Sequence, residues 1–107
     1  MDIRHYLTAA ERDPYQEWCD KLKDRTARVA MLRRVDRMAG GNFGEHRFCQ
    51  DGVWELKIAV GPGYRAYYAH DGKTIILLLC GGTKRTQTAD ITTAVHYWRD
   101  YQRRRHA

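Results

Sequence analysis

The feature that most constrains the fold is a run of three strand-like segments between residues 54 and 82. The segments read WELKIAV, GYRAYYAH and TIILLLCGG, and the short turns GPG and DGK join them. Side chains of a strand alternate between two faces, so each segment can bury one face and offer the other for a different use. Strands connected by such short turns are typical of an antiparallel sheet.

Two cations interrupt the apolar and aromatic pattern of these strands. Lys57 shares a strand face with Glu55, and Arg65 shares a strand face with Tyr67. If Lys57 and Arg65 lie on one face across the turn at residues 61–63, that face is cationic and lined by aromatic rings. Such a surface suits a phosphate backbone. We expect Glu55 to orient a cation rather than to act as a base.

The chain before the sheet predicts one strand and two helices. Residues 3–7 alternate as a strand does, and residues 13–23 and 25–39 carry apolar side chains at helical spacing. Asp24 suits the N-cap of the second helix, because its carboxylate can accept from the first free backbone N–H groups. The two helices are expected to form a hairpin that covers one face of the sheet.

The rest of the chain adds one strand before the central run and a helix after it. Residues 46–50 predict a short strand, and Asp51–Gly52 predicts a hairpin turn. Residues 75–79 are apolar at every position, which predicts a strand covered on both faces inside the sheet. Gly81–Gly82 is expected to end that strand, and a last helix is expected from about Thr88.

The expected order of elements is therefore β-α-α-β-β-β-β-α. This order predicts an α+β fold, with an N-terminal strand and a helical hairpin packed on a mostly antiparallel sheet of four to five strands, plus a C-terminal helix. The 107 residues show no internal repeat and no linker, so we expect one domain over residues 1–107.

The chain is basic, with nineteen Lys and Arg against thirteen Asp and Glu and a formal net charge of +6. Fourteen of the nineteen cations are Arg, whose planar group makes bidentate contacts with phosphate or carboxylate. This charge favours a polyanionic partner or an acidic protein partner. One candidate surface for RNA or the ribosome is the charged side of the second helix, although the same side can simply be solvated; its members are Arg25, Arg28, Arg33 and Arg37.

Other classes of protein are not favoured. The three cysteines are far apart, with no C-x-x-C pair and no zinc-ligand spacing, so neither a disulfide framework nor a metal site or other cofactor is expected. The longest apolar run, residues 75–80, is too short to span a bilayer, and no signal-like segment opens the chain. We therefore expect a cytoplasmic protein with no membrane association.

Four motifs make the sequence more specific. They are GNFG (41–44), DGVWELKI (51–58), GPGYRAYY (61–68) and LLCGGTKRTQTADI (78–91). In this order and spacing they resemble the RelE/ParE toxin superfamily, and within it the HigB-like branch of addiction module killer proteins. The match runs from about Tyr15 to Trp98. It implies a RelE/ParE-like fold and the toxin of a type II toxin–antitoxin system, held inactive by a cognate antitoxin of helix-turn-helix type.

The superfamily leaves the target of such a toxin open. RelE-like members cleave mRNA on the ribosome without a metal, which is our leading expectation and makes mRNA and the ribosome the partners. ParE-like members of the same fold inhibit DNA gyrase instead, because a fold does not fix a function. A third alternative is a catalytically weak toxin that acts mainly within an antitoxin–DNA repressor complex.

The resemblance also assigns roles to residues. It implies that Lys57, in the ELKI motif, is a general base or a phosphate clamp, and that Arg65, in the GYR motif, stabilises the transition state. The basic pair Lys84 and Arg85 would bind phosphate or assist the leaving group. RelE has a catalytic tyrosine early in its last helix, where Ile91 aligns in this chain.

The general acid is therefore not assigned by the resemblance. The strand pattern offers Tyr67, which shares a face with Arg65, and His46, which lies one strand earlier. Both have a plain alternative, since strand tyrosines commonly pack within a sheet and His46 can be an exposed strand residue.

Overall fold

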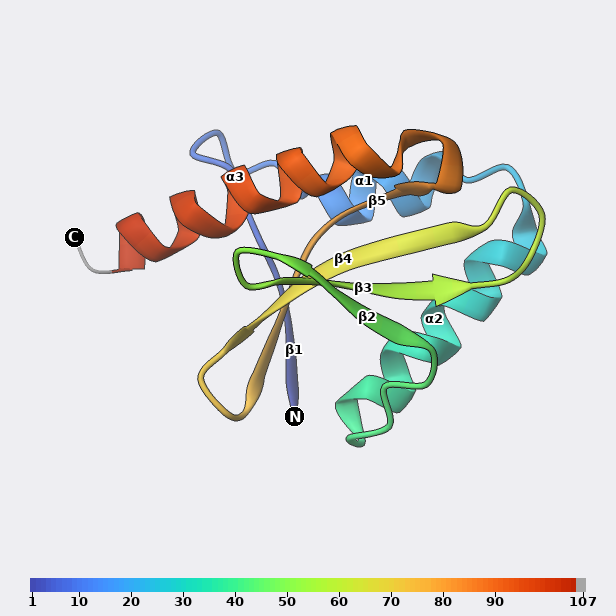
Figure 1. Cartoon of the computed structure of the whole chain (residues 1–107), viewed down its shortest axis with the longest axis horizontal. Coiled ribbons are helices and arrows are strands. Elements are labelled where there is room, and N and C mark those ends of the chain that lie inside the picture. The colour runs from blue at the N-terminus through green and yellow to red at the C-terminus, as the bar shows by residue number, and fades with distance from the viewer. Residues whose placement is uncertain (106–107) are drawn as a thin grey trace.

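Five strands and three helices build the fold, and the computed structural model describes residues 1–105 (Figure 1). The strands are β1 (Asp2–His5), β2 (His46–Gln50), β3 (Val53–Ile58), β4 (Tyr64–Asp71) and β5 (Ile75–Thr83). The helices are α1 (Pro14–Lys21), α2 (Arg25–Ala39) and α3 (Gln87–Arg105), and the short 3₁₀ helix η1 (Lys84–Thr86) precedes α3. The order confirms the predicted β-α-α-β-β-β-β-α pattern.

All five strands form one sheet in the order β1-β5-β4-β3-β2. β1 pairs with β5 in parallel, and the other three pairs are antiparallel. The sheet is thus mostly antiparallel, as predicted, and β5, whose residues 75–79 are all apolar, lies inside it. β2 is an outer strand, and this places the segment that leads into the charged strands at an edge of the sheet.

Aspartates start both helices of the N-terminal hairpin. The Asp13 carboxylate accepts from the backbone N–H of Gln16 at 3.0 Å, and Pro14 occupies the first turn of α1. The predicted cap of α2 is confirmed, because the Asp24 carboxylate accepts from the backbone N–H of Ala27 at 3.1 Å.

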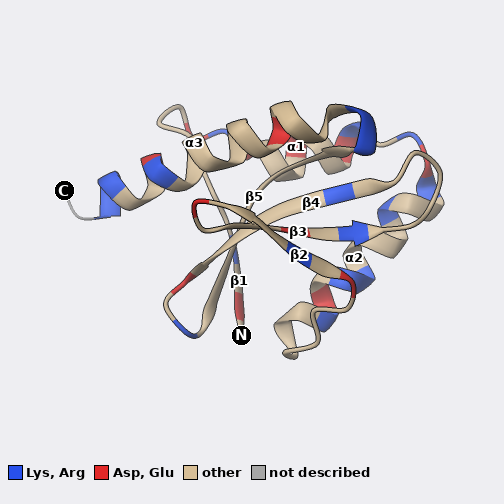
Figure 2. Cartoon of the chain, in the orientation of Figure 1, with Lys and Arg blue, Asp and Glu red and all other residues tan. Residues whose placement is uncertain are grey.

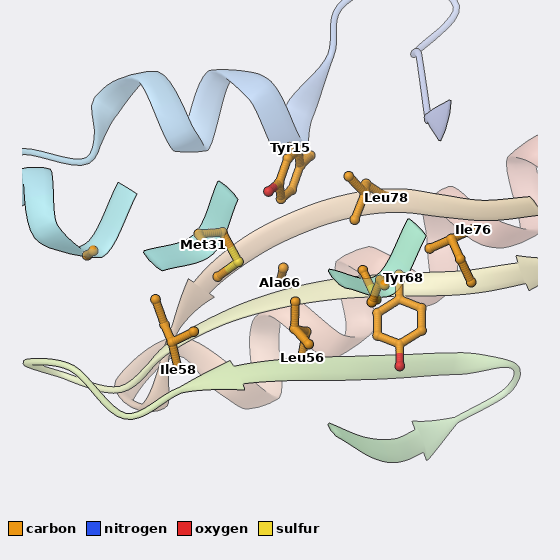
Figure 3. Packing of buried hydrophobic residues seen from close by; sticks show 10 residues of the cluster. Tyr15, Met31, Leu56, Ile58, Ala66, Tyr68, Ile76 and Leu78 are labelled. Atoms are coloured by element: carbon orange, nitrogen blue, oxygen red, sulfur yellow. The ribbon is translucent and has the colours of Figure 1, made fainter. Parts of the chain in front are cut away.

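Apolar side chains pack on both faces of the sheet. On one face, hereafter the hairpin face, α1 and α2 cover a core in which Met31 lies among strand residues (Figure 3). The strand residues of this core are Leu56, Ile58, Ala66, Tyr68, Ile76 and Leu78. On the other face, hereafter the α3 face, Ala94 and Val95 of α3 pack on Val53, Tyr67, Ala69, Leu77, Leu79 and Cys80. Alternation along the strands therefore supplies two cores.

A bulge in β5 changes which residues share a face. Tyr67 lies opposite Cys80 and Tyr68 lies opposite Leu78, so Leu79 is left without a partner on β4. Both Leu79 and Cys80 consequently belong to the core under α3. The shift also sets the end of β5 in the register that brings Gly82 opposite Arg65.

The expected break at Gly81–Gly82 is wrong, because β5 continues through both glycines to Thr83. A Cβ on Gly81 would overlap the ring of Trp18, which approaches from the hairpin face. A Cβ on Gly82 would overlap the carboxylate of Asp90 on the α3 face. These glycines therefore allow close packing on both sides of the strand rather than ending it.

The turn between β2 and β3 confirms the predicted hairpin. Asp51 and Gly52 both have positive φ, at 49° and 86°. Two consecutive residues in this region are typical of a type I′ turn, whose twist matches that of the strands it joins. None of the described helices is long and apolar enough to cross a membrane.

Candidate functional site

A charged pocket of about 400 Å³ opens where β2, β3 and β4 approach the start of α3. Figure 2 shows basic segments on all three of these strands and at the turn before α3. The pocket, hereafter the charged pocket, is lined by Glu45, His46, Arg47, Glu55, Lys57, Arg65 and Gln87. Three of these side chains are cations and two are carboxylates, so the lining carries one excess positive charge at neutral pH.

Lys57 and Arg65 meet in this pocket as the sequence predicted. The two residues are direct partners in the antiparallel pair of β3 and β4, so their side chains point to the same face. The Lys57 side chain is 38% exposed and its Nζ lies 3.7 Å from Oε1 of Glu45. Arg65 is almost fully buried, at 5% exposure. The pair therefore presents one reachable ammonium beside one guanidinium held in place.

Glu55 holds the guanidinium of Arg65. Glu55 is 3% exposed, and its Oε2 lies 3.2 Å from Nε of Arg65. Arg47 Nε donates to Oε1 at 2.7 Å, and this contact raises the pKa of Arg47. Gln87 Nε2 donates to both carboxylate oxygens, at 3.2 and 3.1 Å. One buried carboxylate thus ties β2, β4 and α3 together, and it orients a cation as expected.

The carbonyl of Gly63 joins Arg65 to the basic pair that follows β5. It accepts from Nη1 of Arg65 at 2.8 Å and from the backbone N–H of Lys84 at 3.0 Å. The backbone of Lys84 therefore lies directly beside the Arg65 guanidinium. Lys84 and Arg85 are both exposed residues of η1. The structure brings Lys84 to the margin of the charged pocket, and neither residue belongs to its lining.

Arg34 fixes the position of the loop beside Lys57. Its guanidinium donates to the carbonyls of Lys57 at 2.7 Å, of Phe43 at 3.2 Å and of Glu45 at 3.0 Å. The backbone N–H of Lys57 in turn donates to the carbonyl of Glu45 at 3.1 Å. A helix residue on the hairpin face thus supports one wall of a pocket on the opposite face.

Neither residue considered as the general acid presents its acidic group to the charged pocket. Tyr67 is fully buried, its hydroxyl has no partner among the described residues, and burial raises the pKa of that hydroxyl. His46 lines the pocket at its edge, but it pairs with Leu56 and its ring centroid lies 5.6 Å from that of Trp54. The His46 ring therefore lies on the hairpin face. Ile91, at the position of the RelE tyrosine, is partly buried in the core under α3.

The arginines predicted to bind RNA or the ribosome lie elsewhere. Arg25, Arg28, Arg33 and Arg37 are exposed along α2, whose buried residues pack on the hairpin face. The sheet separates them from Lys57 and Arg65. The structure therefore presents two basic regions on opposite sides of the molecule rather than one continuous surface.

Sequence reasoning missed Arg47, Gln87 and Glu45 as members of the site. Arg47 is the direct partner of Glu55 in the pairing of β2 with β3, so strand parity could have found it once the register was known. Gln87 gave no comparable signal, because its contact depends on where α3 begins over the sheet. Among residues 1–105, no three His, Cys, Asp or Glu side chains gather as a metal ion would require.

Two comparisons identify what the chain is similar to. The model of the family described as phage-derived protein Gp49-like (DUF891) matches residues 17–96. An uncharacterized protein of Haemophilus influenzae is 40% identical over 80 residues, which cover 75% of this chain and 81% of that protein. The matched segment contains α2, all strands from β2 to β5 and the first half of α3, so it includes the whole lining of the charged pocket.

Proposed function

Because this chain belongs to the family of phage-derived Gp49-like proteins, we propose that it acts as the toxin of a type II toxin–antitoxin system. The activity we propose is metal-independent cleavage of mRNA on the ribosome, in the manner of the RelE-like toxins that its motifs resemble. The single observation that carries the proposal is the pairing of Lys57 with Arg65 in one open pocket.

The chemistry requires positive charge more than it requires many catalytic groups. The ribose 2′-oxygen attacks the adjacent phosphorus, the bond to the 5′-oxygen breaks, and the products are a 2′,3′-cyclic phosphate and a 5′-hydroxyl. A base takes the proton of the 2′-hydroxyl, an acid gives one to the 5′-oxygen, and fixed charges stabilise the phosphorane-like transition state. RNA bound by a ribosome arrives already oriented, which lowers the demand on the enzyme.

The residues of the pocket suit these roles. Arg65, fixed by Glu55 and Gly63, offers a guanidinium that needs no rearrangement to meet the developing charge. Lys57 is the reachable cation, and it serves as the clamp on the phosphate or as the base for the 2′-hydroxyl. In this proposal Lys84, whose backbone N–H donates to the carbonyl of Gly63 at the margin of the pocket, assists the departing 5′-oxygen, with Arg85 beside it. The N-terminal end of α3 adds the positive end of a helix dipole.

The same proposal implies its partners. A cognate antitoxin, which we infer to be of helix-turn-helix type, would neutralise the toxin by covering the charged pocket or by displacing α3. The ribosome and mRNA are the targets, which makes the cytoplasm the place of action. The arginines of α2 remain a proposed contact with ribosomal RNA, on the other side of the molecule from the charged pocket.

The test replaces Lys57, because its exposed side chain can be removed without opening a core. Wild type, Lys57→Ala and the control Lys73→Ala are induced in cells, and 5′ ends are mapped on a message with and without a start codon. Lys73 is an exposed lysine in the turn between β4 and β5. We expect cuts within the reading frame that need translation, fall by about 10²–10³-fold in Lys57→Ala and persist in Lys73→Ala.

The other possible outcomes distinguish the alternative functions and test the role of Lys57. Growth arrest with DNA damage and no cuts, unchanged in Lys57→Ala, would overturn the nuclease in favour of gyrase inhibition. The absence of arrest with the wild type would favour a role within an antitoxin–DNA repressor complex. Cuts that persist in Lys57→Ala would keep the nuclease and remove Lys57 from its site.

A further inference from the structure

An aromatic strip lies on the hairpin face of the sheet from β2 to β4, and two of its members, Phe43 and Trp54, pack against the core of that face. Its members, hereafter the aromatic strip, are Phe43, His46, Phe48, Trp54 and His70. The ring centroids of Phe48 and Trp54 are 5.2 Å apart, and those of His46 and Trp54 are 5.6 Å apart. Phe48 is 50% exposed, which is unusual for a large aromatic side chain. The strip is therefore open to solvent at its β2 end.

The register of β2 explains why the strip and the charged pocket lie so close together. Phe48 pairs with Trp54 and His46 pairs with Leu56, which places their rings on the hairpin face. Arg47, between them, pairs with Glu55 and points to the α3 face, into the pocket. Successive residues of the outermost strand thus serve two surfaces that are separated only by the thickness of the sheet edge.

We propose that the aromatic strip binds bases of the single-stranded RNA whose phosphate occupies the charged pocket. The inference rests on the proposed nuclease and names a substrate-binding subsite for it. His46 belongs to the lining of the pocket while its ring lies against Trp54, so the two surfaces adjoin at the β2 edge. A strand of RNA that passes over the β2 edge meets cations on one side and flat aromatic faces on the other.

Stacking and charge together are the usual means by which proteins hold single-stranded nucleic acid. Aromatic side chains accept any base on their faces, and nearby cations follow the backbone. The half-exposed Phe48 supplies the outer stacking surface, and Trp54 supports it from within the sheet. Arg47 and Lys57, on the other side of the edge, supply the positive charge. An RNA strand uses all of these groups, whereas a purely apolar protein partner would leave the cations unused.

The test measures binding without cleavage. A fluorescent 2′-O-methyl oligonucleotide cannot undergo attack by its 2′-oxygen, and a matched oligonucleotide with abasic positions carries the same charge without bases. Affinities of the full chain for both are measured by fluorescence anisotropy at one fixed salt concentration. We expect the wild type to bind the base-bearing oligonucleotide at least about fivefold more tightly than the abasic one, the lower end of a single stacking contact.

Variants at Phe48 then assign the preference to the strip. Phe48→Leu keeps an apolar side chain but removes the ring, and we expect it to lose the preference for bases. Phe48→Tyr keeps the ring and should keep the preference. Leu32→Ala is the matched control, because Leu32 is an exposed apolar residue of α2 at 62% exposure. Equal binding of both oligonucleotides by the wild type, or a preference that survives Phe48→Leu, would overturn the proposal and leave the strip to a protein partner.

The result is separable from the fate of the nuclease. Cuts in cells that depend on Lys57, without any preference for bases, would reject the strip as a subsite and retain the nuclease. A preference that depends on Phe48, without cuts in cells, would retain the strip as a nucleic-acid surface and reject the proposed cleavage.

Discussion

The two faces of β3 and β4 carry alternate residues of the same strands into opposite environments. On the hairpin face, Leu56 and Tyr68 are fully buried beneath α1 and α2 (Figure 3). On the α3 face, Glu55 and Arg65 of the same two strands are almost as buried, at 3% and 5% exposure, but they are charged. These residues of the hairpin face lie in a closed apolar core, whereas those of the α3 face line the open charged pocket.

The difference follows from how far each helical layer extends. The helical hairpin supplies Tyr15, Ala27, Met31 and Met38 to the core of its face. α3 supplies Ala94 and Val95 to its core, but at its start only Gln87 reaches the sheet at the pocket, and it does so through hydrogen bonds to Glu55. Buried charges add little to stability compared with apolar packing. Their retention at the uncovered end of the strands is what a binding site for an anion requires.

The largest effect that separates the two faces is expected from Glu55→Ala. The change leaves the Arg65 guanidinium buried without its carboxylate, which typically costs about 3–5 kcal/mol in the free energy of unfolding. Urea denaturation of the purified variant measures this. A loss below about 1 kcal/mol would mean that Arg65 reaches solvent once its partner is removed, and the charged face would then be less buried than the structure shows.

A double variant sharpens the same test. Replacing both partners with apolar residues, as Glu55→Leu with Arg65→Met, removes the unpaired charge and should recover most of the lost stability. It should not recover cleavage of mRNA, because the stabilising guanidinium is gone. Recovery of both properties would contradict the view that these charges are kept for function.

The second effect is expected from Leu56→Ala, one residue further along β3. Leu56 is fully buried on the hairpin face, and its truncation leaves a cavity that should cost about 3 kcal/mol in the free energy of unfolding. Cleavage per folded molecule should stay near that of the wild type, since the side chain points away from the pocket. The exposed Leu32→Ala is the control and should stay within about 0.5 kcal/mol. A large loss of activity without a loss of stability would break the division between the two faces.

Much of the fold was predictable because alternation and helical spacing are local patterns. The element order, the interior place of β5 and the meeting of Lys57 with Arg65 all follow from strand parity and short turns. The continuation of β5 through Gly81–Gly82 was not predictable. It depends on Trp18 and Asp90, which come from distant parts of the chain and need the space that the glycines leave.

The site was predictable in its cations and not in how they are held. Lys57 and Arg65 stand out in an apolar run, whereas the burial of Glu55 depends on where α3 crosses the sheet. The face of the sheet to which His46 points depends on the register of β2 against β3, and a shift of this register by one residue would turn the side chain to the opposite face. Patterns along the chain therefore identify the charged residues, and tertiary packing decides which of them can be reached.

The smallest expected effect concerns the pKa of a titratable side chain at the margin of each face. Burial lowers the pKa of His70 below its ordinary value of 6.5, and the nearby His46 lowers it further. On the other face, the contact with Glu55 raises the pKa of Arg47 instead. The hairpin face therefore disfavours charge at its edge, whereas the α3 face supports charge through pairing.

This contrast predicts a pH dependence with a definite sign. The unfolded chain protonates His70 at a higher pH than the folded chain does, so stability should decline as pH falls from above 6.5 toward the lower folded pKa. Urea midpoints at pH 7.5 and 5.5 should therefore differ more in the wild type than in His70→Gln. The exposed His96→Gln is the control and should retain the wild-type difference. An NMR titration that places the imidazole of His70 at or above 6.5 would show that the edge of the hairpin face tolerates charge. In that case the two faces would differ in how completely their helices cover them, and not in how they treat a charge at the margin.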